Sequence, residues 1–291
     1  MKIIIICGGN SSEKEISIKS GMSVFSSVKK KYDSEILLLS DDYSIIKDTY
    51  REGDIVFNAL HGGYGESGEI QSFFEKENIN FIGSGSRACE IAMDKSRCKR
   101  VAQKLDILVP FERIFSGDTS IYEEFQVPFI IKPNNEGSSV GFNIINSQKE
   151  MLRALKANKE RKVMFEEFIN GREITVSILG DKVLPIVEII PNSGVYDYTS
   201  KYTKGKSSYI VPAVMNLDVE LQIKNQSMEL FNEIGCEDYS RIDYILSDEN
   251  IPYFLEINTS PGMTETSLFP KSAASIKLDF DSLIKKIISL K

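Results

Sequence analysis

Two apolar segments near the C-terminus, residues 239–246 and 252–258, carry the side chains with the clearest chemistry. Their pattern predicts the two strands of a hairpin. Because side chains two apart on a strand share one face, Glu256 and Asn258 point the same way. One register of the hairpin sets Asp243 opposite Glu256.

Two opposed carboxylates destabilise a sheet unless something compensates for their charge. A hard cation would do so, since it prefers carboxylate and amide oxygens, and Mg²⁺ usually completes its shell with water and phosphates. ATP is therefore the expected companion. The same register sets Arg241 opposite Asn258. The alternative is that these polar residues lie on a solvated face of the sheet. The apolar character of the flanking residues argues against it, because they are expected to face the core: Ile242, Tyr244, Leu255 and Ile257.

A loop of small residues, 136–141, follows Lys132 and could bind phosphate. Its glycines and serines would let backbone N–H groups close around an anion, and the lysine would add positive charge. The lysine precedes the glycines, so the segment is not the G-x-x-x-x-G-K-[ST] loop. Taken alone, an ordinary hairpin turn explains the segment equally well.

Two further loops have unusual compositions. Residues 58–71 contain His61, the single histidine, and four glycines, which is typical of a loop that closely approaches a ligand; a hydrogen-bonded turn histidine is the alternative. Residues 196–202 hold three tyrosines and a lysine, which favours a lid over a bound ligand rather than a plain surface loop.

The elements that must position these residues follow two patterns. Residues 1–94 alternate apolar strands (2–7, 35–39, 54–60, 81–83) with helices (13–28, 69–77), which favours a parallel sheet covered by helices. The glycines after the first strand lack the G-x-G-x-x-G spacing, so a dinucleotide-dependent oxidoreductase is disfavoured. Later segments predict α+β units, with helices at 94–105, 148–158, 218–234 and 280–290, and strands at 129–132, 141–145, 163–168, 174–179 and 183–190.

Composition narrows the function class. The chain has 291 residues, 42% hydrophobic, and a net charge of −7, which argues against a nucleic-acid partner. It has neither an apolar run long enough to span a bilayer nor a signal peptide, so no membrane partner is expected. Its four cysteines are scattered, which favours buried thiols and a cytoplasmic location.

The motifs together resemble the D-alanine–D-alanine ligases of the ATP-grasp superfamily. The resemblance runs nearly end to end through G-G-N-S-S-E-K-E-I-S (8–17), L-H-G-x-x-G-E-x-G (60–68), M-D-K (93–95), K-P-x-x-E-G-S-S-V-G (132–141), Y-D-Y-x-x-K-Y (196–202), S-R-I-D (240–243), E-I-N-T-S-P-G-M-T (256–264) and S-L (267–268).

The resemblance implies an N-terminal Rossmann-like (preATP-grasp) α/β substrate domain, 1–94, before a two-part ATP-grasp fold, 95–170 and 171–291. It also implies the reaction. ATP phosphorylates one D-alanine to an acyl phosphate, a second D-alanine attacks, and D-alanyl-D-alanine, ADP and phosphate leave, for peptidoglycan synthesis. Two Mg²⁺ (or Mn²⁺) ions are the implied metals, and a homodimer is expected by analogy.

The site residues follow from matched positions. ATP phosphates would meet Lys95, Lys132 and Lys201, and the adenine and ribose would meet Glu166, Glu167, Phe168, Ile169 and Glu173. The metals would bind Asp243, Glu256 and Asn258. Glu13 and His61 would bind the first D-alanine, and Ser267 and Leu268 the second. Arg241 and the Gly262 N–H would stabilise the oxyanion, and Glu13, Ser138 and Tyr202 would link the substrate domain to the lid.

Two alternatives remain open. Another ATP-grasp ligase, acting on a different amino or hydroxy acid, would use the same metal and phosphate groups; Glu13, Tyr202, Ser267 and Leu268 favour D-alanine. A nucleotide sensor without ligase activity would be expected to lack Arg241, Glu256 or Asn258, all of which are present.

Overall fold

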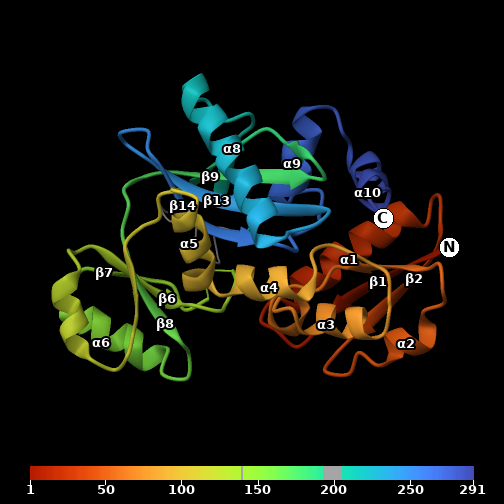
Figure 1. Ribbon diagram of the computed structural model, residues 1–291, viewed down its shortest axis with the longest axis horizontal. Coiled ribbons are helices and arrows are strands. Elements are labelled where there is room, and N and C mark those ends of the chain that lie inside the picture. Colours follow the sequence, from red (N-terminus) through yellow and green to blue (C-terminus); the bar gives the residue numbers. More distant parts are fainter. Residues whose placement is uncertain (139, 193–202, 204) are drawn as a thin grey trace.

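The computed structural model describes residues 1–138, 140–192, 203 and 205–291. Its chain forms three sheets in sequence, visible from the N-terminal end at the right of Figure 1 to the central sheet at the lower left and the C-terminal sheet above. No helix in these ranges is long and apolar enough to cross a bilayer.

The N-terminal sheet is parallel, with strand order β2-β1-β3-β4, as the strand–helix alternation predicts. Ile3 and Ile5 of β1 pack beneath helix α1, and Ile4 and Ile6 pack toward α3 on the other face. Since both faces are covered, the strand is apolar throughout. The elements are β1 (Lys2–Gly8), α1 (Lys14–Val28), β2 (Asp33–Leu39), α2 (Ile45–Thr49), β3 (Ile55–Asn58), α3 (Glu69–Lys76), β4 (Phe81–Ile82) and α4 (Ser86–Met93).

The central unit is an antiparallel sheet, β5-β8-β6-β7, with helix α6 beside it. Its elements are α5 (Lys95–Lys104), which joins it to α4, then β5 (Glu112–Ile114), a 3₁₀ helix (Thr119–Glu124), β6 (Phe129–Pro133), β7 (Asn143–Ile145), α6 (Gln148–Ala157) and β8 (Val163–Glu167).

Aromatic rings dominate the core of this central unit. Phe165 is fully buried and lies against the rings of Phe115, Phe125 and Phe129, with centroids 5.6–5.8 Å apart. We expect Phe165→Ala to lower the free energy of unfolding by about 3–5 kcal/mol, because it leaves a cavity that these rings cannot fill. Denaturant unfolding measures this, with exposed Leu152→Ala as the control. A loss as small as that of the control would contradict this packing.

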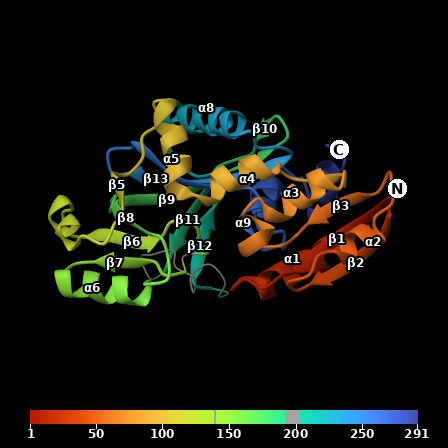
Figure 2. The ribbon, with the colours of Figure 1, turned by 60° about the horizontal axis from the view of Figure 1, so that its bottom comes forward.

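The C-terminal sheet is antiparallel, with order β12-β11-β9-β13-β14 and β10 beside β9. Its elements are β9 (Gly171–Leu179), β10 (Lys182–Val183), β11 (Val187–Pro191), β12 (Ser207–Ile210), α8 (Leu217–Ile234), β13 (Tyr239–Ser247), β14 (Pro252–Asn258), α9 (Leu268–Ser275) and α10 (Phe280–Ile288). Helices α5 and α8 cover one face of this sheet (Figures 1 and 2). Helix α10 returns to pack on α1, so the two termini lie near each other (Figure 1).

Several details differ from the sequence predictions. The single strand predicted at 183–190 is two strands, β10 and β11, because Pro185 between them has no N–H to donate to a ladder. Helices α2, α4 and α9 and strands β5 and β12 were not predicted. Leu255 was expected in the core, but a register shift after Asp243 pairs Tyr244 with Phe254, so Phe254 is buried and Leu255 turns to a cavity.

Candidate active site

Two cavities of about 350 and 390 Å³ meet where the three sheets approach one another. The first is bounded by the N-terminal unit, the loop before β7 and the C-terminal sheet. The second lies between the central and C-terminal sheets. Lys95 and Glu256 line both cavities, and their side chains form an ion pair with Nζ 3.1 Å from Oε2. Anything transferred between the cavities would pass these two side chains.

Glu13 stands at the wall of the first cavity and joins two units of the fold. The Ser138 hydroxyl donates a hydrogen bond to its carboxylate. Gly62 and Gly137 lie on either side of this carboxylate, and a Cβ at either position would come within 2.9 Å of Glu13 Oε2. The absence of a side chain at both positions therefore lets the glycine loop and the 136–141 loop close on one acid. Tyr202, the third predicted member of this triad, lies outside the described residues, as do Ser139 and Lys201.

His61 is buried at the same wall and is oriented from both ring nitrogens. Its Nδ1 lies 3.5 Å from Glu66 Oε1, and its Nε2 lies 2.9 Å from Ser20 Oγ. Ser20 Oγ also accepts the Met263 N–H at 3.2 Å. With its proton on Nδ1, His61 accepts from Ser20 and presents its donor to Glu66.

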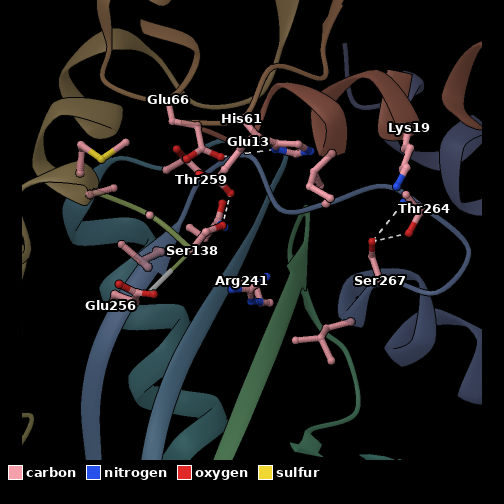
Figure 3. A pocket seen from close by; sticks show the side chains of 18 of the residues that line it. Glu13, Lys19, His61, Glu66, Ser138, Arg241, Glu256, Thr259, Thr264 and Ser267 are labelled. Carbon is pink, nitrogen blue, oxygen red and sulfur yellow. Dashed lines mark hydrogen bonds and ion pairs between the residues drawn. The ribbon is translucent and has the colours of Figure 1, made fainter. Parts of the chain in front are cut away.

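Glu66 is a cavity residue for which sequence reasoning assigned no role. Burial raises the pKa of its carboxyl, the negative charge of Glu13 adds to this rise, and His61 opposes it. Glu66 stands five residues after His61, inside the glycine-rich motif, and this placement was the available signal. Figure 3 shows Glu13, His61 and Glu66 together on one side of the cavity.

The opposite wall is built by strand alternation on β13. Ile242, Tyr244 and Leu246 are fully buried beneath the helices. Arg241 and Asp243 point to the other face, where Nε and Nη2 of the guanidinium donate to the two carboxylate oxygens, at 3.0 and 2.8 Å. Thr175 of β9 donates a further hydrogen bond to Asp243 at 2.5 Å.

The predicted hairpin register is confirmed: Asp243 pairs with Glu256 and Arg241 with Asn258 across β13 and β14. Glu256 and Asn258 line the first cavity, whereas Asp243 lies beside it, held by Arg241. Within the described ranges no three or more His, Cys, Asp or Glu side chains form a cluster that could hold a metal. The candidate metal site is the mixed set predicted from the sequence, with the carboxylates of Asp243 and Glu256 and the amide of Asn258. This hard oxygen set, one residue of which borders both cavities, fits Mg²⁺ or Mn²⁺.

The far end of the first cavity is formed by the loop that leads into α9. Ser267 and Leu268, predicted to bind the second substrate, line it together with Gly262, predicted to stabilise the oxyanion. Ser267 Oγ accepts the Thr264 N–H at 3.1 Å and lies 2.8 Å from Thr264 Oγ1 (Figure 3). This pairing fixes the serine hydroxyl at the cavity surface, and Leu268 packs behind it against Val187 and Ile189.

The second cavity gathers the residues predicted to hold a nucleotide. Lys95, Lys132, Glu166 and Glu173 line it, together with Glu167, Phe168 and Ile169 at the end of β8. Pro110, Ile130, Ile190, Ile245 and Leu255 supply apolar surface. A slot with apolar sides and lysines at one end suits a flat base followed by phosphates.

Glu166 was predicted to contact adenine or ribose; it lines the second cavity, and its carboxylate also binds two lysines. It is buried against two ammonium groups, with Lys132 Nζ at 2.6 Å and Lys99 in contact with the other oxygen. Burial alone would raise the pKa of this carboxyl, but Lys132 and Lys99 lower it below its usual range. The acid therefore stays ionised inside the protein, and Lys99 is a second charged residue that sequence reasoning missed.

Two antiparallel sheets that face each other across a lysine- and carboxylate-lined cavity, after a Rossmann-like unit, define the ATP-grasp class of fold. Residues 113–289 match the family described as D-ala D-ala ligase C-terminus. The D-alanine–D-alanine ligase of Aquifex aeolicus is 40% identical over 99% of this chain and 100% of its own length, and that of Methylacidiphilum infernorum is 38% identical over 99% and 94%. The chain belongs to the D-alanine–D-alanine ligase family.

Solved structures agree with this assignment. The ligase of Bacillus anthracis complexed with ATP superposes with a TM-score of 0.86 at 29% identity, covering 100% of this chain and 97% of the other. The VanG D-Ala:D-Ser ligase of Enterococcus faecalis superposes with a TM-score of 0.84 at 28% identity, covering 99% and 98%. The predicted fold and family are confirmed.

Proposed function

We infer that this chain joins two D-alanines to D-alanyl-D-alanine with conversion of ATP to ADP and phosphate, as a step of peptidoglycan precursor synthesis. The observation that carries this function is the junction of the two cavities at Lys95 and Glu256. A nucleotide in the second cavity would present its terminal phosphate to an amino acid in the first.

An unactivated carboxylate is a poor electrophile, and phosphorylation gives it a leaving group. The first D-alanine would place its ammonium at Glu13 and its carboxylate near His61. Lys95 and Lys132 would hold the phosphates, and Lys201 of the undescribed segment would join them. The second D-alanine would leave its carboxylate at Ser267 and the Leu268 N–H, with its amine directed at the acyl phosphate.

Arg241 and the Gly262 N–H would stabilise the negative charge of the tetrahedral intermediate. Asp243, Glu256 and Asn258 would hold two Mg²⁺ or Mn²⁺ ions. Bound there, the ions would neutralise charge on the phosphates. The adenine edge would lie along 167–169, and Glu166 and Glu173 would contact the adenine and ribose. Glu166 also binds Lys132, so it would orient that lysine toward the phosphates.

Glu66 would fix His61 for the first substrate. We expect Glu66→Gln to raise KM for D-alanine at the first site about tenfold. The neutral amide should interact with the imidazole of His61 about 1.4 kcal/mol more weakly than the carboxylate does, which leaves the ring less firmly oriented. KM for ATP should not change, since Glu66 does not line the second cavity. Initial-rate kinetics measure both constants, with exposed Glu52→Gln as the control. Equal increases in both constants would contradict this role.

Phosphate release with Mg-ATP tests the function itself, using D-alanine beside L-alanine, D-lactate, D-serine and no amino acid. D-serine is included because a relative of the same fold is a D-Ala:D-Ser ligase. Release that requires D-alanine supports the proposal. Release with none of these substrates, despite tight ATP binding, would overturn the substrate assignment and favour a sensor or another ligase.

We further propose the three domains 1–94, 95–170 and 171–291, a cytoplasmic location and a homodimer. The four cysteines, all buried and free, support a reducing compartment. The dimer rests on family analogy, and light scattering of the purified chain tests it.

A further inference from the structure

Lys99 is a fully buried cation that lines neither cavity in the described part of the chain. It lies on α5, its side chain is 1% exposed, and its ammonium contacts the carboxylate of Glu166 on β8. Burying an ammonium is costly unless it is paired, so such a residue needs a physical reason. The pairing explains how Lys99 is tolerated but not why a second cation is placed there.

The reason lies in the charge of the three-residue group. Glu166 binds Lys99 with one oxygen and Lys132 with the other, and the Lys132 side chain, 11% exposed, lines the nucleotide cavity. Burial lowers the pKa of Lys99, and the Glu166 carboxylate opposes that shift. With both lysines protonated, the two ammonium groups and one carboxylate sum to +1. Glu112, bonded to Ser96 at 2.8 Å, attracts Lys99 more weakly than Glu166 does.

Without Lys99 the group would consist of the ion pair between Glu166 and Lys132, with no net charge. The Glu166 carboxylate would then neutralise Lys132, and the cavity would offer little positive charge at that end. With Lys99 present, Glu166 is shared between two ammonium groups and a unit of positive charge remains for an incoming anion. Such a charge is worth more at a buried site than in water, because the dielectric response is weaker.

We propose that Lys99 is a positioning residue that, through Glu166, leaves the charge of Lys132 available to the phosphates of ATP. The inference rests on the proposed use of the second cavity for ATP. It adds a residue that never touches the nucleotide yet sets how strongly its phosphates are bound.

The test measures Kd for ATP, ADP, AMP and adenosine with the full chain by titration calorimetry or displacement. We expect Lys99→Met to raise Kd for ATP about 10- to 100-fold, Kd for ADP by less, and Kd for adenosine by less than about twofold. The effect should fall in this order because each phosphate removed lowers the negative charge of the ligand. Lys99→Arg keeps the charge and should stay within about threefold of wild type. Exposed Lys104→Met on the same helix is the matched control.

A double variant separates charge from packing. Lys99→Met with Glu166→Gln again leaves one positive charge on Lys132, so the ratio of ATP affinity to adenosine affinity should recover to within about fivefold of the wild-type ratio. The proposal would be overturned if the single variant lost affinity for adenosine and ATP equally, or if the double variant preferred ATP over adenosine no more than the single variant does. If Lys99→Met does not fold, a double variant that keeps the wild-type preference for ATP over adenosine supports the proposal, and a double variant that binds adenosine but has lost that preference overturns it.

Failure of the broader function has a different signature. Wild-type protein that binds ATP but releases no phosphate with D-alanine would refute the ligase assignment and leave the charge argument intact. Wild-type protein that binds adenosine and ATP equally would refute the charge argument alone.

Discussion

Replacing Arg241 with alanine is expected to lower kcat for D-alanine-dependent phosphate release by about 10²- to 10³-fold, the usual cost of removing one preorganised oxyanion donor. The side chain lines the first cavity, and Asp243 holds its guanidinium at 3.0 and 2.8 Å. Because the guanidinium is always charged and already oriented, it needs no rearrangement as charge develops. Its effect should therefore be larger in the transition state than in the ground state.

ATP affinity provides the contrast for this variant. Arg241 does not line the nucleotide cavity, and Asp243 keeps its hydrogen bond from Thr175 at 2.5 Å. We therefore expect Kd for ATP to change less than about threefold in Arg241→Ala. Arg241→Lys keeps the positive charge but not the planar, two-donor geometry of the guanidinium, so its kcat should lie between those of wild type and Arg241→Ala. Exposed Arg153→Ala on α6 is the control. Equal losses in kcat and ATP affinity would rule out the oxyanion role.

Glu256→Gln is the second variant with a large expected effect. It keeps the shape of the side chain but removes the carboxylate that stands between the cavities, 3.1 Å from Lys95. Losing a metal-bound carboxylate at the transferring phosphate should cost about 3–4 kcal/mol, or roughly 10²- to 10³-fold in kcat/KM. The Mg²⁺ concentration for half-maximal rate should also rise.

Metal binding without turnover separates these effects. Paramagnetic resonance of Mn²⁺ with ADP present should show weaker binding to Glu256→Gln than to wild type, while Glu233→Gln, on the exposed face of α8, should match wild type. If the variant loses activity but keeps its Mn²⁺ affinity, Glu256 is not a metal ligand, and its role is limited to the ion pair with Lys95.

The parts of the site that sequence predicted best depend on local rules. The i, i+2 spacing of Arg241 and Asp243 places both side chains on the face opposite Ile242, because side chains alternate along a strand. The turn alone does not set their partners: the pairing of Leu246 with Pro252 would oppose Asp243 to Leu255, and the register shift brings Glu256 there instead. Leu255 escaped the same rule because the register shift after Asp243 adds one residue to β14.

The parts that sequence could not predict depend on distant partners. Lys99 and Glu166 are 67 residues apart, on a helix and a strand whose approach no local pattern encodes, so the buried charge group emerged only in three dimensions. Helix α9 was obscured by Pro270 near its start, a position in the first turn where proline is tolerated. Helix α4 was also missed, although its buried Ala88, Ile91 and Ala92 stand at helical spacing, so the sequence did carry a signal for it.

D-Alanine labelled with ¹⁸O in both carboxylate oxygens tests the central claim most directly. If the γ-phosphoryl group of ATP is transferred to the carboxylate of the first D-alanine, one labelled oxygen leaves with phosphate when the second amine attacks. Mass spectrometry should then find D-alanyl-D-alanine and singly labelled phosphate in equal amounts. Unlabelled phosphate, or phosphate without dipeptide, would contradict ligation through an acyl phosphate at the junction of the two cavities.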